Sequence, residues 1–195
     1  MAATLAALTM LAGCAREVPK VDSQPARPAV ALPQDLCAVI GLEALGAVVP
    51  DPQPSVLTDR VRLPDVVYQA SSCEVHTGTP DPARGTGRLS FTLARHTAYM
   101  GETGEQHADR TFDKHCKDLV TITPTNATDL TVADVGQRAC GRLVRVPSEP
   151  RRVDLYLRVL SGADVLIVNQ SRDPGPTDAT ALTDLTRSVL AKLRA

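Results

Sequence analysis

The sequence lacks tryptophan and holds only three tyrosines and two phenylalanines among 195 residues. Aromatic cages and aromatic platforms that stack on carbohydrate rings are therefore not expected. An excess of charge is also missing, because 21 Lys and Arg residues against 22 Asp and Glu residues leave a net charge of -1. A nucleic-acid partner is not expected, since such domains present a basic face.

Enzyme signatures are missing as well. The sequence has no GxSxG, HExxH, GxxxxGK or GxGxxG pattern. Gly85-Thr86-Gly87 is interpreted as a turn, because a strand pattern rather than a helix follows it. No two cysteines have the close spacing typical of zinc sites. We predict no catalytic residue, metal site or cofactor, while a site built from distant residues stays open.

The most informative segment is Leu11-Ala12-Gly13-Cys14, which ends an uncharged apolar run that begins at Ala2. The run is shorter than the ~20 residues of a spanning helix and fits the ~7–15 residue core of a signal peptide. The segment resembles the lipobox of bacterial lipoproteins, in which a peptidase cleaves before the cysteine and the thiol receives a diacylglycerol. This resemblance implies a signal peptide at residues 1–13, lipidation of Cys14 with chains such as palmitate, and a cell-membrane location on the extracytoplasmic face.

Proline dominates the segment after Cys14. Residues 14–33 contain Pro19, Pro25, Pro28 and Pro33 and show no periodic apolar face. Such a segment favours an extended polyproline conformation of ~3.1 Å per residue, so it predicts a tether of roughly 50 Å or a disordered linker. Residues 34–195 have the size of a single domain.

Apolar periodicity within that domain predicts alternating helices and strands. Helices are expected at residues 34–47, at 104–120 and from 177 or 178 onward, and strands at 66–76, through 89–93, and at 134–146, 152–160 and 164–170. Residues 51–54 are expected to form an irregular loop. The prediction is an α+β fold in the order α-β-β-α-β-β-β-α, with an antiparallel sheet of about five strands and helices packed on it.

The other four cysteines predict two structural disulfides in an exported domain. Three pairings of Cys37, Cys73, Cys116 and Cys140 are possible. Sequential pairing is favoured, because Cys37–Cys73 and Cys116–Cys140 would each join the buried face of a helix to a following strand. A catalytic thiol at Cys116, next to His115, is the less favoured alternative, since adjacent helical residues point to different faces.

Histidines and arginines supply the remaining site candidates. His107 and His115 could share a helix face as a weak divalent site, and His76 and His96 could approach each other across paired strands, but solvated or structural roles are favoured. Five arginines gather on two neighbouring predicted strands and their turn: Arg142, Arg145, Arg151, Arg152 and Arg158. Guanidinium groups suit phosphate or carboxylate, so this cluster could dock an anionic envelope polymer or a partner protein.

The motifs together resemble one known family. A lipobox, a Pro-rich leash, the segment Asp35-Leu36-Cys37-Ala38-Val39-Ile40 opening a helix, and a second cysteine in a strand look like the small actinobacterial lipoproteins of the DUF3558 type. Members tend to carry tryptophan two residues after that cysteine, where this sequence has Val75. The resemblance implies a secreted, lipid-anchored α+β domain and identifies no catalytic residue in this sequence.

Three functions follow from these observations, in order of preference. The first is a membrane-anchored, monomeric binding or accessory module of the cell envelope that docks through its exposed sheet face or the Arg-rich hairpin. The second is a carrier that holds a small apolar ligand in a cavity between the sheet and the helices. The third is a hydrolase whose residues are distant in sequence, for which a cleft holding His76, His96 and a carboxylate would be the evidence.

Overall fold

The computed structural model describes residues 31–57, 68–80, 85–122, 127–145, 152–173 and 179–194. All of these except Ala31 belong to one compact unit, Leu32–Ala195. The predicted signal peptide, Cys14, most of the tether and Arg151 lie outside the described residues. The elements follow in the order α1 (Leu36–Ile40), α2 (Leu42–Gly46), β1 (Pro52–Leu57), β2 (Tyr68–Thr77), β3 (Thr86–His96), α3 (Gly104–Ile122), β4 (Thr128–Asp129), β5 (Arg138–Arg145), β6 (Val153–Ser161), β7 (Asp164–Asp173) and α4 (Ala179–Arg194).

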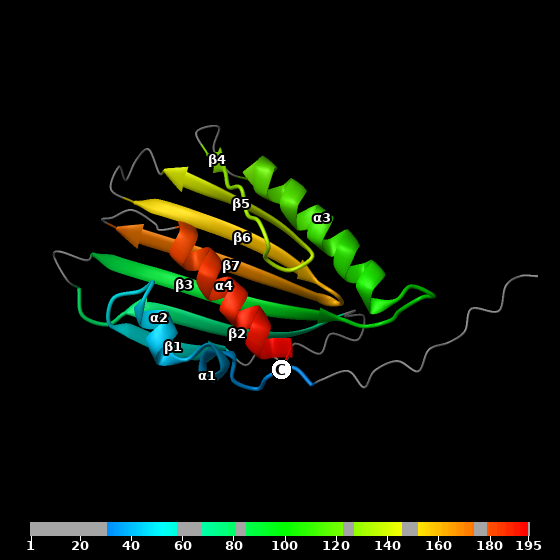
Figure 1. The fold of residues 1–195 in the computed structure, drawn as a ribbon, viewed down its shortest axis with the longest axis horizontal. Helices are drawn as coiled ribbons and strands as arrows, with labels where there is room; N and C mark the ends of the chain where they lie inside the picture. Colours follow the sequence, from blue (N-terminus) through cyan, green and yellow to red (C-terminus); the bar gives the residue numbers. More distant parts are fainter. Residues whose placement is uncertain are drawn as a thin grey trace, which may run out of the picture. The chain divides into compact units, whose positions relative to one another are not determined.

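The strands form one antiparallel sheet in the order β1-β2-β3-β7-β6-β5-β4 (Figure 1). The predicted α+β class and antiparallel sheet are confirmed. The predicted number of about five strands is wrong, because the described residues contain seven. The two additional strands, β1 and β4, lie at the two edges of the sheet, and β4 is only two residues long.

Residues 51–54, predicted as a loop, instead lead into the edge strand β1. Pro52 and Pro54 lack an N–H group, which an edge strand tolerates because it pairs on one side only. Asp51 starts the strand with a positive φ of 43°. Its carboxylate accepts a hydrogen bond of 2.8 Å from the Thr79 N–H, and its carbonyl accepts one from Gly78. These bonds fasten β1 to the end of β2.

The first predicted helix, at residues 34–47, is divided into α1 and α2 at Gly41. Gly41 has φ 89°, a conformation that residues with a Cβ atom rarely adopt. The Asp35 carboxylate caps α1 by accepting a hydrogen bond of 2.9 Å from the Ala38 N–H. The two short helices thus turn the chain over one face of the sheet.

That face, here called the inner face, holds the main core. Alternate residues of the central strands are buried there, and most of them are apolar: Cys73, Val75, Leu89, Phe91, Leu93, Leu155, Leu157, Val159, Leu166 and Val168. Leu36 and Ile40 of α1 and Leu182 and Val189 of α4 pack against them. The space between these helices and the sheet is therefore filled with side chains.

The opposite, outer face is covered by α3 at one end. Ala108 and Phe112 of α3 pack on Leu160 and Val165 in a second, smaller core cluster. Gly104 lets α3 begin directly against the sheet, because a Cβ atom there would collide with the carbonyl oxygen of His96. Within the described residues, no helix packs on the other end of the outer face.

Each face carries one disulfide. The Cys37–Cys73 bond joins α1 to β2 on the inner face, and the Cys116–Cys140 bond joins α3 to β5 on the outer face. The pairing is the sequential one favoured from the sequence, and it ties a helix to the sheet on both sides. None of the helices described is long and apolar enough to cross a bilayer.

Candidate ligand groove

The open end of the outer face is a grid of polar side chains set by the strand register. Residues paired across β2, β3, β7 and β6 form two rows: His76, Arg88, Ser171 and Asp154 in the first, and Glu74, Ser90, Asn169 and Tyr156 in the second. Alternation along each strand places these residues opposite the buried apolar ones. The same period of two that builds the core therefore builds the polar face.

A groove of about 530 Å³ lies over this grid. Its walls come from β2, β3, β6 and β7 and include Ser72 and Thr92 beside the members of the two rows other than His76. The volume falls in the range of ~300–1,000 Å³ typical of small-molecule sites. Every residue that lines the groove has a polar or charged side chain, so the groove does not match the cavity lined by apolar residues that the carrier hypothesis requires.

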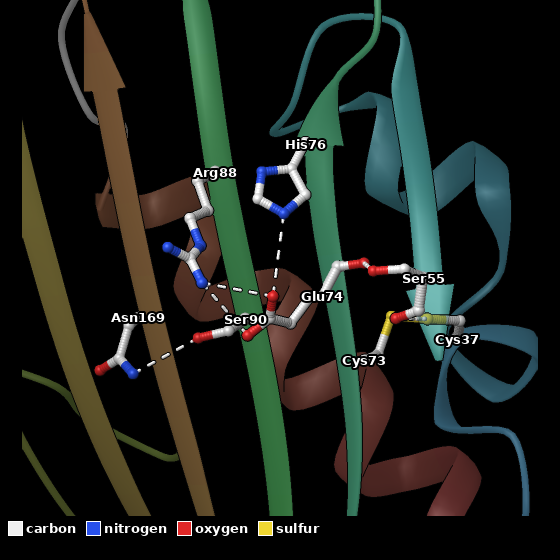
Figure 2. Close-up of polar contacts among 8 residues, drawn as sticks. All are labelled: Cys37, Ser55, Cys73, Glu74, His76, Arg88, Ser90 and Asn169. Atoms are coloured by element: carbon white, nitrogen blue, oxygen red, sulfur yellow. Dashed lines mark hydrogen bonds and ion pairs between the residues drawn. A yellow bond between two sulfur atoms is a disulfide. The ribbon is translucent and has the colours of Figure 1, made fainter. Parts of the chain in front are cut away.

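On one side of the groove, Glu74 contacts two basic side chains (Figure 2). Arg88 Nη2 lies 3.2 Å from Glu74 Oε1 and 3.3 Å from Oε2, and His76 Nε2 lies 3.8 Å from Oε2. The Glu74 side chain is 23 % exposed, whereas that of Arg88 is 59 % exposed. The carboxylate is thus more recessed than the guanidinium that contacts it.

Asp154 lies on the opposite side of the groove, on β6. Its carboxylate accepts hydrogen bonds from Arg152 Nε at 2.9 Å, from Arg152 Nη2 at 3.2 Å and from the Ser171 hydroxyl at 2.6 Å. Asp154 is only 7 % exposed, so these bonds compensate a nearly buried charge. Burial, followed by the charge of Asp154, raises the pKa of the neighbouring Tyr156. The Tyr156 hydroxyl therefore stays protonated and able to donate a hydrogen bond.

Smaller polar groups occupy the middle of the groove. The hydroxyls of Ser72 and Thr92 lie 3.1 Å apart, and Asn169 Nδ2 donates a hydrogen bond of 3.4 Å to Ser90 Oγ (Figure 2). Hydroxyl, amide, guanidinium and carboxylate groups are therefore presented together. Such a lining offers both donors and acceptors to a ligand.

Arg158 lies at the boundary between the groove and α3. It is 8 % exposed, and its Nη1 donates to the carbonyls of Leu157 and Val168 and to Asn169 Oδ1 at 2.9, 3.2 and 2.9 Å. Its Nε has no hydrogen-bond partner among the described residues. Burial lowers the pKa of Arg158 to about 10. No carboxylate of the described part of the chain forms an ion pair with it.

The predicted arginine cluster is spread over several environments. Arg142 is occupied by Asp129, whose Oδ1 lies 2.8 Å from its Nε, and Arg145 is exposed at the end of β5. Arg152 and Arg158 contribute to the groove and to its boundary, respectively. Arg151 lies outside the described residues. The structure therefore places two of the five predicted arginines beside one site.

The predicted histidine pairs do not form sites. His76 is in register with Arg88, whereas His96 is in register with Tyr68, so the two lie at opposite ends of the hairpin, roughly 26 Å apart along the strands. His107 Nε2 contacts the Tyr99 carbonyl and Glu102, and its Nδ1 accepts from Arg110. The described residues contain no group of three or more side chains that could hold a metal. Cys116 is in a disulfide and is no free thiol.

Sequence reasoning missed Glu74, Asp154, Ser90 and Asn169 as members of one site. The available signal was the run of polar residues alternating with apolar ones in each strand. Which strands lie next to each other could not be found from that signal, because the paired residues of β3 and β7 are 69 to 87 positions apart in the sequence.

No family model matches the chain, and no curated protein matches it. Membership of the DUF3558-type lipoproteins therefore stays a prediction. One solved structure that is similar is that of LpqN, involved in cell envelope biogenesis of Mycobacterium tuberculosis. The identity is 12 %, the match covers 72 % of this chain and 78 % of that chain, and the TM-score is 0.30. A likeness of this size does not carry an activity from one protein to the other.

Proposed function

We propose that this chain is an exported lipoprotein, anchored through Cys14, whose domain acts as a binding module for hydroxyl-rich envelope ligands such as saccharides. The groove on the open end of the outer face is the proposed ligand site. One observation carries the proposal: four neighbouring strands present donors and acceptors around a hollow of about 530 Å³. Saccharide hydroxyls both donate and accept hydrogen bonds, so they match such a lining.

The disulfides support the exported location. Disulfides persist in oxidising compartments outside the cytoplasm, and both bonds here join a helix to the sheet. The anchor rests on the lipobox resemblance of the sequence. A diacylglycerol supplies two acyl chains, which hold a protein at a bilayer where one chain binds only reversibly.

The polar contacts favour recognition by hydrogen bonds over ring stacking. Among the residues that the structure describes, only Tyr156 brings an aromatic ring to the groove. The hydrogen bonds that the Asp154 carboxylate accepts from Arg152 and Ser171 keep these three side chains in place before a ligand arrives. Prearranged groups lose less side-chain freedom on binding, which favours affinity.

Co-sedimentation of the full-length protein with a purified insoluble envelope polysaccharide tests this function. Ser90→Trp would fill the groove and is expected to lower the apparent affinity at least tenfold. Ser188→Trp is the matched control, because Ser188 is exposed on α4, away from the groove, and should bind like the wild type. Equal binding by both variants, or no binding by the wild-type protein, would contradict the proposal.

A further inference from the structure

The ligand class of the groove can be narrowed by the buried charge at its boundary. We infer that the groove selects saccharides that carry a carboxylate, with Arg158 as the buried positive charge that this carboxylate neutralises. The inference rests on the proposed binding function and adds the chemical class of the ligand.

The first step is the unusual state of Arg158. Buried charges in folded proteins are normally paired with an opposite charge, because burial removes the hydration of the ion. Arg158 is 8 % exposed, and its partners are two carbonyls and the Asn169 amide oxygen. These dipoles satisfy Nη1 but leave the positive charge without a counter-ion in the described part of the chain.

The second step is the connection of Arg158 to the groove. Asn169 lines the groove and accepts from Arg158 through Oδ1, while its Nδ2 donates to Ser90. A ligand group seated over Asn169 is therefore one side chain away from the buried guanidinium. Charges interact strongly at such a distance when water is largely excluded.

The third step is the charge balance of the site. Arg88, Arg152 and Arg158 provide three positive charges, and Glu74 and Asp154 provide two negative ones. One positive charge remains. A carboxylate brings a single negative charge and a planar pair of oxygens that suits guanidinium groups, whereas a phosphate monoester brings closer to two charges.

The ligand carboxylate is contacted directly by Arg88. Arg88 is 59 % exposed and bonded to Glu74 at the groove wall, so its guanidinium can reorient toward a ligand without leaving a buried position. Arg158 stays in place and acts through the field it creates at Asn169. Hydroxyls of the same saccharide remain available to Ser72, Thr92 and Ser171.

Calorimetric titration of the full-length protein with trigalacturonate and with neutral maltotriose tests this inference. We expect the wild-type protein to bind trigalacturonate at least tenfold more tightly than maltotriose. Arg158→Met should bring the two affinities to within about twofold, because it weakens trigalacturonate binding far more than maltotriose binding. Equal affinities in the wild-type protein, or an unchanged preference in Arg158→Met, would overturn the inference.

A second variant tests the inference in case Arg158→Met does not fold. Asn169→Asp supplies a carboxylate at the oxygen that Arg158 already contacts, and it should abolish the preference for trigalacturonate. Ser72→Asp adds the same charge farther from Arg158 and should weaken trigalacturonate binding less. If the protein bound maltotriose but not trigalacturonate, the carboxylate assignment would be contradicted, whereas the proposed saccharide-binding function would still be supported. If inorganic phosphate displaced the bound saccharide and galacturonate did not, the carboxylate assignment would also be wrong. If none of the probes bound, both the carboxylate assignment and the proposed binding function would be wrong.

Discussion

Arg158 and Asn169 form a contact on the outer face of the sheet, between the region beside α3 and the groove. Arg158 Nη1 donates to Asn169 Oδ1 at 2.9 Å, across the neighbouring strands β6 and β7. The contact has a consequence for the stability of the domain. A buried cation that loses one of its few acceptors is left with an incomplete set of hydrogen bonds.

A double-mutant cycle on this pair should reveal that coupling. Asn169→Ala is expected to lower the free energy of unfolding by about 1–3 kcal/mol in the wild-type background, because it leaves Arg158 without its side-chain acceptor. In the Arg158→Met background the same substitution should lower the free energy of unfolding by a clearly smaller amount. Urea denaturation of the four proteins measures both steps. Equal costs in the two backgrounds would show that the contact is energetically silent.

Removal of either disulfide should destabilise the domain substantially. The bonds close loops with sequence separations of 36 and 24 residues. The chain-entropy relation gives about 3.5 kcal/mol for loops of this size. Replacing both members of one pair by alanine avoids a free thiol, and thermal unfolding measures the loss. A change below about 1 kcal/mol for either double variant would contradict a structural role.

The domain should lose stability as the pH falls below about 6.5. His96 is 4 % exposed, and burial, reinforced by the positive charges of His107 and His115, lowers its pKa in the folded state. The unfolded chain then binds a proton more readily than the folded one, so stability is present above pH 6.5 and declines as the pH falls toward the folded pKa. Burial also lowers the pKa of His115, which adds in the same direction.

Urea midpoints at pH 7 and pH 5 measure this dependence. His96→Gln should reduce the difference between the two midpoints. His76→Gln serves as the control, because the His76 side chain is 50 % exposed and should leave the difference unchanged. An unaltered pH dependence in His96→Gln would rule out His96 as a source.

Cys14 should carry the lipid anchor. Intact-mass analysis of the protein isolated from native membranes is expected to show cleavage before Cys14, a diacylglycerol on that residue, and the loss of four hydrogens for two disulfides. Cys14→Ser should yield a protein without the added lipid mass and no longer held in the membrane fraction. An uncleaved amino terminus with free thiols would contradict both the anchor and the compartment.

The sequence predicted those parts of the fold that depend on local patterns. The long helix α3 and the strands β2, β6 and β7 follow from apolar periodicity. The edge strand β1 was missed because Pro52 and Pro54 suggest a loop, and only its position at the sheet edge makes them tolerable. The division at Gly41 was missed because the apolar spacing continues across it.

The site was less predictable than the fold. Arg152 and Arg158 were singled out for their charge, yet one lies in the groove and the other is buried at its boundary. Strand order determines which polar residues meet, and the pairing of β3 with β7 brings Ser90 beside Asn169. A single sequence carries no local signal for a pairing between segments so far apart.

Residue-resolved NMR titration tests the central claim, that the open polar grid is the ligand site. Trigalacturonate is added to the ¹⁵N-labelled full-length protein. We expect saturable amide shifts concentrated at the groove positions, with Glu74, Arg88, Ser90, Asn169 and Tyr156 among the largest. Saturable shifts confined to α4 and β1, or a spectrum unchanged at millimolar ligand, would contradict it.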